Sequence, residues 1–297
     1  MRFKRSLAAF AGIGLAFSLA ACGEAGTEGG GADVEAADDC EGKFDDGTQM
    51  AQWADSGEIS VGVKYDQPGL GFKGAADDIP KGFDVEVAKI LVADLCIDPQ
   101  GDGVEWVETV SDNREPFLQQ ERVGLVLASY SITDDRRSVV GQTGPYMITG
   151  QQLLVPADSD IESIDELQGQ EVCSVTGSTS IDRINEKGAK GVGFDSYSEC
   201  VQKVMDGTVD GMSTDGSILA GFAAENEGEL SVVGDEFSEE RIGVGYQPGN
   251  TETCEWINET LTTAYDEGTW AEAFEGTLGP SGVETPEPPE LDDCQTF

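Results

Sequence analysis

Arg136 ends a polar segment whose first residues, 129–133, come directly after a strand of the buried type. A guanidinium forms two parallel hydrogen bonds to a carboxylate, and Ser129 and Ser131 can add hydroxyl or backbone donors. These residue types therefore predict a site that binds a carboxylate. The alternative interpretation is that Arg136, like the neighbouring Arg137, is a solvated surface charge.

Two more polar positions lie at the ends of expected strands. Ser178 and Thr179 stand where Gly177 breaks a strand and a helix begins. A helix N-terminus offers free N–H groups and a positive dipole end to a carboxylate, although Ser178 can equally serve as a helix cap. Asp215 ends the strand expected at residues 209–214, and α/β folds place ligands at the carboxyl ends of strands. Because the chain contains 58 Asp and Glu residues, a surface charge is the other interpretation of Asp215.

The composition excludes several classes of function. The 297 residues include 17 Lys and Arg against 58 Asp and Glu, which gives a formal net charge of −41. Such a surface repels nucleic acid phosphates and anionic lipid headgroups. The sequence has no histidine, which removes His-dependent metal sites and catalysis of the Ser-His-Asp or Cys-His type. It also has no phosphate-binding loop, EF-hand loop or C-x-x-C pair, so we expect no cofactor, no metal and no ATP hydrolysis by this chain.

Strand-like runs alternate with helical periodicity along most of the chain, which is typical of an α/β fold. Ile59, Val61 and Val63 alternate as in a strand, and the apolar residues between Phe83 and Leu95 fall on one helical face. Further strands are expected at residues 104–106, 123–127, 172–175 and 209–214, and further helices at 114–120, from 178, and around 201–205, 218–222 and 256–265.

The first residues indicate an export signal. Residues 1–5 are basic and residues 7–20 form an apolar run that is short for a membrane span. Residues 19–22, Leu-Ala-Ala-Cys, resemble the lipobox of bacterial lipoproteins. This resemblance implies a signal peptide at residues 1–21 and a lipid on Cys22. The alternative is an ordinary secretory signal that happens to contain a cysteine.

Residues 22–39 are acidic and rich in glycine, with a single large apolar side chain. Such a stretch cannot bury enough surface to offset the entropy of ordering it, so we expect a disordered, flexible tether. The globular part should begin near Cys40.

Six cysteines remain after Cys22, and export would place them in a compartment that favours disulfides. They allow 15 connectivities. One cysteine lies on an expected strand and the next opens the following helix; another opens an amphipathic helix, and the last lies in the proline-rich tail. These placements favour the pairs Cys173–Cys200 and Cys254–Cys294, and elimination leaves Cys40–Cys96.

Four ordered motifs resemble those of the family 3 solute-binding proteins, the polar amino-acid-binding components of ABC importers. The resemblance covers residues 44–280. More narrowly, residues 64–72, 111–114 and 286–291 resemble the actinobacterial glutamate-binding lipoproteins. The four motifs are Gly82-Phe-Asp-Val-Glu-Val87, Ser129-Tyr-Ser-Ile-Thr-Asp-Asp-Arg136, Val175-Thr-Gly-Ser-Thr179 and the stretch from Asp210 to Asp215.

The resemblance implies a two-lobe, periplasmic-binding-protein-like α/β fold in which two hinge strands join the lobes. We expect lobe 1 to be discontinuous and to comprise residues 40–149 and 244–297. Lobe 2 is then expected at residues 150–243. In this family the lobes close on the ligand.

The resemblance also favours the ligand-binding interpretation of the polar positions. It implies that Arg136 binds the α-carboxylate of an amino acid and that Asp215 receives its α-ammonium. Ser178 and Thr179 would hold the same carboxylate from lobe 2. Both charges of the ligand need partners, because burying either one unpaired is very costly.

Lys64 and Arg114 are expected to decide which amino acid binds. In members of the family that bind basic amino acids, the position of Lys64 tends to be acidic, so a lysine there favours an acidic ligand. Arg114 offers a second cation, with Ser111 one turn earlier. The alternative is that both are surface residues paired with the many acidic side chains.

We therefore expect reversible capture without chemistry, by a lipid-anchored protein on the outer face of the cytoplasmic membrane. The expected ligand is glutamate, or else aspartate, and the expected partner is the transmembrane permease of an ABC importer with a separate ATPase. The protein is expected to act as a monomer. The alternatives are binding of glutamine or another polar amino acid and, because the fold also hosts cyclohexadienyl dehydratases, a lyase activity.

Overall fold

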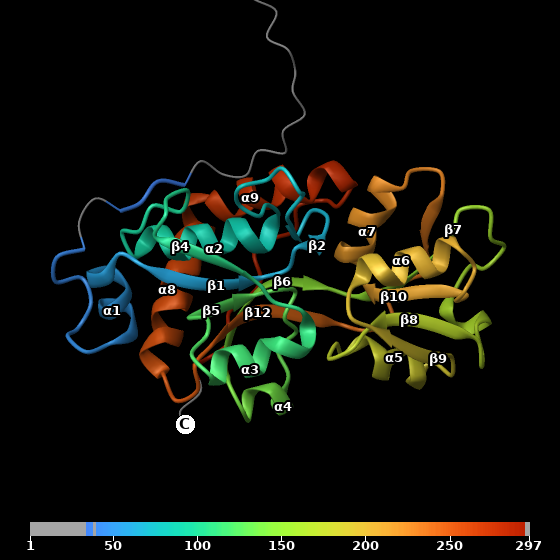
Figure 1. The fold of residues 1–297 in the computed structure, drawn as a ribbon, viewed down its shortest axis with the longest axis horizontal. Coiled ribbons are helices and arrows are strands. Elements are labelled where there is room, and N and C mark those ends of the chain that lie inside the picture. The colour runs from blue at the N-terminus through green and yellow to red at the C-terminus, as the bar shows by residue number, and fades with distance from the viewer. Residues whose placement is uncertain (1–33, 38–39, 295–297) are drawn as a thin grey trace, which may run out of the picture.

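The computed structural model describes residues 34–37 and 40–294 and contains two α/β lobes placed end to end along the longest axis (Figure 1). Each lobe is built on a five-stranded sheet with helices against its faces. The two-lobe fold of the periplasmic-binding type that the sequence predicted is therefore confirmed.

The sheet of lobe 1 is parallel in its first three strands and antiparallel where β12 joins it. In sheet order, its strands are β4 (Val104–Glu108), β1 (Ile59–Val63), β5 (Leu125–Leu127), β12 (Glu240–Tyr246) and β6 (Gly141–Thr149). β1 is parallel to both β4 and β5, and its Val61 and Val63 are fully buried. Parallel strands are covered on both faces, which explains the nearly continuous apolar run of β5.

Helices and a small hairpin complete lobe 1. The hairpin is β2 (Asp66–Gln67) with β3 (Gly71–Phe72); the helices are α1 (Gln49–Ser56), α2 (Phe83–Asp94), α3 (Arg114–Gln119), α4 (Asp134–Arg137), α8 (Thr251–Glu267) and α9 (Thr269–Thr277), and the 3-10 turns are η1 (Ser111–Asn113) and η3 (Gly279–Ser281). The helix expected from Phe83 is confirmed, but it is buried on all sides and not along one face. The reason is that α2 packs on the sheet on one side and on α8 and α9 on the other.

In the sheet of lobe 2, successive apolar residues of a strand pack against helices on opposite faces. Leu153 and Val155 pack with Ile184 of one helix, whereas Leu154 belongs to the cluster that includes Val201. In sheet order the strands are β11 (Leu230–Val233), β7 (Gln151–Pro156), β10 (Gly211–Asp215), β8 (Glu171–Val175) and β9 (Lys190–Phe194), and the helices are η2 (Ile164–Glu166), α5 (Ser180–Glu186), α6 (Tyr197–Met205) and α7 (Gly216–Glu225). α6 and α7 lie on one face of the sheet and α5 on the other (Figure 1).

Two chain segments connect the lobes. β6 ends at Thr149 and β7 begins at Gln151, so the first passage is at Gly150. The chain returns between β11 and β12, and Glu240 of β12 already pairs with Thr149. The two passages therefore lie side by side, which is the geometry of a two-strand hinge.

Three disulfides stabilise the described part of the chain, and none of them joins one lobe to the other. The disulfides are Cys40–Cys96, Cys173–Cys200 and Cys254–Cys294, the same pairs that the sequence favoured. In addition, Asp292 of the tail forms ion pairs with Arg137, at 2.6 Å, and with Arg241 of β12.

The expected signal peptide and Cys22 lie outside the described residues. Of the expected tether, residues 34–37 are described. Val34 packs against the core of lobe 1, and the N–H of Ala37 donates to the carbonyl oxygen of Ala93 at 2.9 Å. These contacts attach that part of the segment to α2. Within residues 34–37 and 40–294, no helix combines the length and the apolar character needed to span a bilayer.

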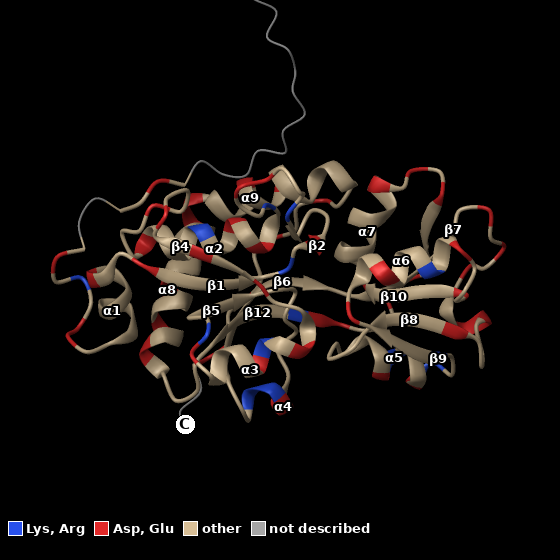
Figure 2. Cartoon of the chain, viewed as in Figure 1, with Lys and Arg blue, Asp and Glu red and all other residues tan. Residues whose placement is uncertain are grey.

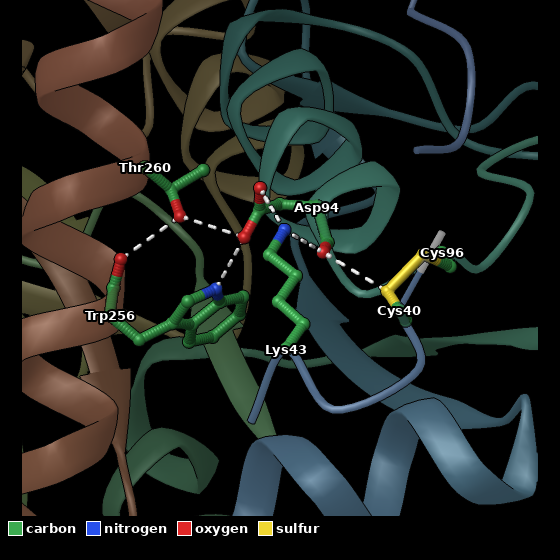
Figure 3. The surroundings of a disulfide bond; sticks show 6 residues. All are labelled: Cys40, Lys43, Asp94, Cys96, Trp256 and Thr260. Atoms are coloured by element: carbon green, nitrogen blue, oxygen red, sulfur yellow. Dashed lines mark hydrogen bonds and ion pairs between the residues drawn. A yellow bond between two sulfur atoms is a disulfide. The ribbon is translucent and has the colours of Figure 1, made fainter. Parts of the chain in front are cut away.

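Asp94, the last residue of α2, joins three segments that are remote in sequence (Figure 3). One of its carboxylate oxygens accepts a hydrogen bond from Lys43 Nζ at 2.6 Å. The other accepts from Trp256 Nε1 at 2.8 Å and from Thr260 Oγ1 at 3.3 Å, both on α8. The disulfide of Cys40 lies beside this cluster, so the start of the globular chain is fixed to α2 and α8 together.

We expect Asp94→Ala to lower the free energy of unfolding by about 1–3 kcal/mol, because Trp256 Nε1 loses its acceptor in a partly buried place. Lys43→Ala should cost less than about 1 kcal/mol, because solvent screens such an ion pair and the two side chains are 32% and 30% exposed. Urea denaturation with the disulfides intact measures both changes. Equal losses would show that the indole contact is not the main contribution.

Candidate functional site

The polar residues predicted at the site follow the carboxyl ends of strands from both lobes. Lys64 follows β1, Ser129 follows β5, and Asp215 is the last residue of β10. Since β1 and β5 belong to lobe 1 and β10 to lobe 2, the predicted residues lie where the lobes face each other. Of the nine predicted residues, Ser178 and Thr179 are half-buried, and the buried ones are Lys64, Ser111, Arg114, Ser129, Ser131, Arg136 and Asp215.

Arg114 is 2% exposed and is held mainly by backbone carbonyls. Its guanidinium donates to the carbonyl oxygens of Ser111 at 3.1 Å, Ala128 at 3.2 Å and Ser129 at 3.0 Å, all in lobe 1. A fourth bond, 3.0 Å long, reaches the carbonyl oxygen of Gly177 in lobe 2. A guanidinium has five N–H groups, so these four bonds leave about one for a ligand.

Arg136 keeps more of its donors free. It donates to the carbonyl oxygen of Ser131 at 2.7 Å and, like Arg114, to that of Gly177, at 2.9 Å. Its Nε lies 3.3 Å from a carboxylate oxygen of Glu115. Two of its five N–H groups are therefore hydrogen-bonded, and a third faces Glu115. Arg136 remains the better candidate to bind a carboxylate.

The two guanidinium groups lie close together over one aromatic ring. Arg114 is 4.5 Å and Arg136 is 4.9 Å from the centre of the Tyr130 ring. Burial and, next, the charge of Arg136 lower the pKa of Arg114 to about 10, so Arg114 stays protonated at neutral pH. Glu115 pairs with only one of them. This pair of buried cations favours the approach of a further anion.

Lys64 adds a third buried cation. It is 3% exposed, and its Nζ donates to Ser111 Oγ at 2.8 Å. The ring of Tyr197, the first residue of α6 in lobe 2, lies 5.9 Å from Nζ. Burial, followed by the charge of Arg114, lowers the pKa of Lys64 to about 7, against the opposing effect of Asp66. An anion beside this amine would restore its full charge.

Ser129 orients Arg114 through its backbone carbonyl. It has a positive φ of 45°, a strained conformation for a residue with a side chain. Its N–H donates to Asp84 Oδ2 at 2.8 Å and its hydroxyl to Gln67 Oε1 at 2.7 Å. Asp84 is fully buried and also accepts from the Tyr146 hydroxyl at 2.7 Å. This network fixes the turn that presents its carbonyl to Arg114.

Ser131 orients Arg136 in the same way, since its carbonyl oxygen accepts a hydrogen bond from that guanidinium. The sequence analysis expected serine donors directed at a ligand. In the structure, the carbonyl oxygens of Ser129 and Ser131 instead orient the two arginines.

Ser178 and Thr179 precede α5, which begins at Ser180, two residues later than the sequence suggested. The Ser178 hydroxyl donates to the carbonyl oxygen of Val175 at 2.7 Å, and the Thr179 hydroxyl donates to Glu240 Oε2 at 3.2 Å. The backbone N–H groups of Thr179 and Ser180 meet no acceptor among the residues that the structure describes. These N–H groups, and not the hydroxyls, are therefore available to an anion.

Asp215 is a buried carboxylate without a hydrogen-bond donor among the described residues. It is 4% exposed and lies directly before α7 without capping it. Burial and, next, the charge of Glu240 raise its pKa to about 8, although Arg114 and Arg136 act in the opposite direction. A cation beside Asp215 would offset the cost of burying its charge.

Sequence reasoning missed several residues that support the site. Tyr130 and Asp84 lie inside the quoted motifs, so their positions were open to the same reasoning that selected Ser129. Glu240 and Tyr197 carry no local signal. Their roles follow from contacts with Thr179 and Lys64, which lie far away in the sequence.

The assembled groups are complementary to a zwitterion that carries an additional negative charge. Three buried cations from lobe 1 lie opposite Asp215 of lobe 2. Figure 2 shows how few Lys and Arg segments the ribbon of either lobe contains beside the many Asp and Glu segments. No group of three or more His, Cys, Asp or Glu side chains in the described ranges is placed to hold a metal ion. The arrangement therefore suits a small organic ion with paired charges.

Comparisons with known proteins identify the family and relatives of this chain. Residues 59–279 match the sequence profile of the bacterial extracellular solute-binding proteins, family 3. The glutamate-binding protein GluB of Corynebacterium efficiens is 37% identical over 285 residues, which cover 92% of this chain and 89% of that protein.

Solved structures show the same similarity. An ancestral arginine-binding protein bound to glutamine superimposes with a TM-score of 0.69 at 31% identity, over 75% of this chain and 98% of that one. The ancestral amino acid-binding protein AncCDT-1, a precursor of cyclohexadienyl dehydratase, gives a TM-score of 0.70 at 29% identity, over 78% and 100% of the two chains.

Proposed function

Because this chain belongs to the bacterial extracellular solute-binding proteins of family 3, we propose that it captures free glutamate outside the cytoplasm for the permease of an ABC importer. The observation that carries this proposal is the cluster of Arg114, Arg136 and Lys64, three buried cations opposite the unpaired carboxylate of Asp215. An α-amino acid with an acidic side chain has two carboxylates and one ammonium, which match these groups in sign.

Each charge of the ligand has a partner in this proposal. The α-carboxylate takes the free N–H groups of Arg136 together with the backbone N–H groups of Thr179 and Ser180. The α-ammonium pairs with Asp215. The side-chain carboxylate pairs with Lys64, assisted by the remaining N–H of Arg114. Since the contributing groups come from both lobes, the ligand draws the lobes together as it binds.

The energetics suit reversible capture. A micromolar dissociation constant corresponds to about −8 kcal/mol, which two matched carboxylates and one ammonium can supply after the cost of ordering. Closure also removes water from around these charges, which strengthens each contact. Tight but reversible binding is what a delivery protein requires.

Glutamine is the second candidate ligand. The observation that favours it is the pKa of Lys64, about 7, because a neutral amine hydrogen-bonds to an amide and needs no anion. The ancestral arginine-binding protein of the same fold is bound to glutamine. Aspartate would place its shorter side chain farther from Lys64.

We propose capture without catalysis. A lyase activity is the alternative, because one similar structure is a precursor of cyclohexadienyl dehydratase. The pKa values of about 7 for Lys64 and about 8 for Asp215 would also suit a general acid and a general base. Recovery of the bound amino acid unchanged, checked by NMR after prolonged incubation, supports capture, and its conversion to a product would refute it.

The lipid anchor remains part of the proposal. Modification of Cys22 would tether the protein to the outer face of the cytoplasmic membrane, close to the permease, and the three disulfides suit that oxidising compartment. We propose that the protein acts there as a monomer, with ATP hydrolysis by a separate subunit.

Lys64→Met tests the choice of ligand. It should reduce glutamate affinity by roughly 2–5 kcal/mol, because it breaks a desolvated charge pair, and should reduce glutamine affinity much less. Titration calorimetry with both amino acids measures the two losses. Lys81→Met is the matched control, since the Lys81 side chain is 59% exposed and should affect neither ligand. Equal losses for glutamate and glutamine in Lys64→Met would contradict the assignment.

The ratio of glutamate affinity to glutamine affinity should depend on pH. Above pH 7 the Lys64 amine loses its proton in the closed arrangement when no anion lies beside it, because burial lowers its pKa to about 7. The glutamate complex then holds one proton more than the glutamine complex, so the ratio should fall by up to about tenfold per pH unit above 7. Asp215 and the α-amino group affect both ligands alike and cancel in the ratio.

Calorimetry at several pH values between 6 and 9 measures this ratio. In Lys64→Met the ratio should be independent of pH. A ratio that rises with pH in the unmodified protein would mean that Lys64 does not pair with the side-chain carboxylate.

A further inference from the structure

Residues 66–68 of lobe 1, called the latch segment below, contact two helices of lobe 2. In Figure 1 the β2 hairpin, which contains Asp66, lies next to α6 and α7. Asp66 Oδ2 accepts a hydrogen bond from the backbone N–H of Tyr197 at 2.8 Å, and the Asp66 carbonyl oxygen accepts from Ser198 Oγ at 3.4 Å. A carboxylate of one lobe therefore sits at the positive end of a helix of the other, an arrangement that attracts the two lobes to each other.

The second contact of the latch segment is steric. A Cβ at Gly221, in the middle of α7, would lie 2.1 Å from the carbonyl oxygen of Pro68. Glycine inside a helix destabilises it relative to alanine, so its presence there needs a reason. The approach of Pro68 gives that reason, because the latch segment fits against α7 only where the side chain is missing.

Tyr197 connects the latch segment to the ligand site. Its ring lies 5.9 Å from Lys64 Nζ, and its hydroxyl shares a 2.7 Å hydrogen bond with Thr214 Oγ1, next to Asp215. Tyr197 is 3% exposed. The contacts of Asp66 and Gly221 involve protein atoms only, so they are the same whichever amino acid binds.

We propose that Asp66, Tyr197 and Gly221 form a latch that favours the closed arrangement of the lobes independently of the identity of the ligand. The inference rests on the proposed function in that closure accompanies binding. It assigns two tasks to different residues. Lys64 selects the ligand, and the latch sets the affinity for every ligand by shifting the equilibrium between open and closed lobes.

Gly221→Ala tests the steric contact. Alanine favours the helix, so the variant should fold at least as stably as the unmodified protein, while its Cβ opposes closure against Pro68. The affinities for glutamate and for glutamine should both fall, by the same factor of at least about fivefold. Unchanged affinities, or a loss confined to one of the two amino acids, would overturn the latch.

Asp66→Ala tests the charge at the start of α6. Removal of a side chain that accepts from a helix N-terminus should weaken glutamine binding by about 3- to 30-fold. Glutamate should lose at least as much, because the charge of Asp66 also raises the pKa of Lys64. Asp78→Ala is the matched control: it removes the same charge from an exposed position of the loop that follows the hairpin. Equal effects of the two variants would show that the result reflects net charge and not the latch.

Small-angle X-ray scattering of the ligand-free protein provides a test that does not depend on which amino acid binds. Gly221→Ala should have a larger radius of gyration than the unmodified protein, because it shifts the lobes toward the open arrangement. Equal radii would overturn the latch. If neither glutamate nor glutamine binds, the proposed function fails, and the comparison of the two radii still decides about the latch.

Discussion

Two arginine side chains buried beside each other are the constraint on which the site depends. Removing a guanidinium from water is costly unless its N–H groups find acceptors. The chain of lobe 1 supplies them by turning its carbonyls inward after β5, which requires the left-handed backbone of Ser129 and the buried carboxylate that fixes it. The carbonyl of Gly177, which accepts from both arginines, belongs to lobe 2. Closure of the lobes and solvation of the arginines are therefore coupled.

The opposite charge poses the same problem in lobe 2. Asp215 is buried with no hydrogen-bond donor in the described part of the chain, and its pKa is raised to about 8, whereas Lys64 across the interface has a pKa lowered to about 7. Each group would be stabilised by an ion that the protein itself does not provide. A ligand with an ammonium and two carboxylates relieves both costs at once, which is why we consider the electrostatics stronger evidence for the ligand class than any single contact.

The disulfides of the described chain do not cross the hinge. Cys40–Cys96 and Cys254–Cys294 tie both ends of the globular chain to lobe 1, and Cys173–Cys200 lies within lobe 2. Asp94 strengthens the first junction through Lys43 and α8. Each lobe is thus stabilised internally. The interactions that cross between the lobes are hydrogen bonds, close contacts and the 3.5 Å ion pair of Arg183 with Glu240, all of which can break during opening.

The sequence by itself determined the α/β alternation and the cysteine pairs, and it selected polar residues that the fold brings together between the lobes, because periodicity, motif order and side-chain chemistry are local properties. It did not determine what those residues do. Ser129 and Ser131 orient arginines with their carbonyls, Arg114 is largely satisfied by backbone, and Glu240, Tyr197 and Asp66 act through partners that lie far away in the sequence. Only the tertiary structure decided these roles, because a hydrogen bond or a shifted pKa depends on groups that the fold brings together from distant positions.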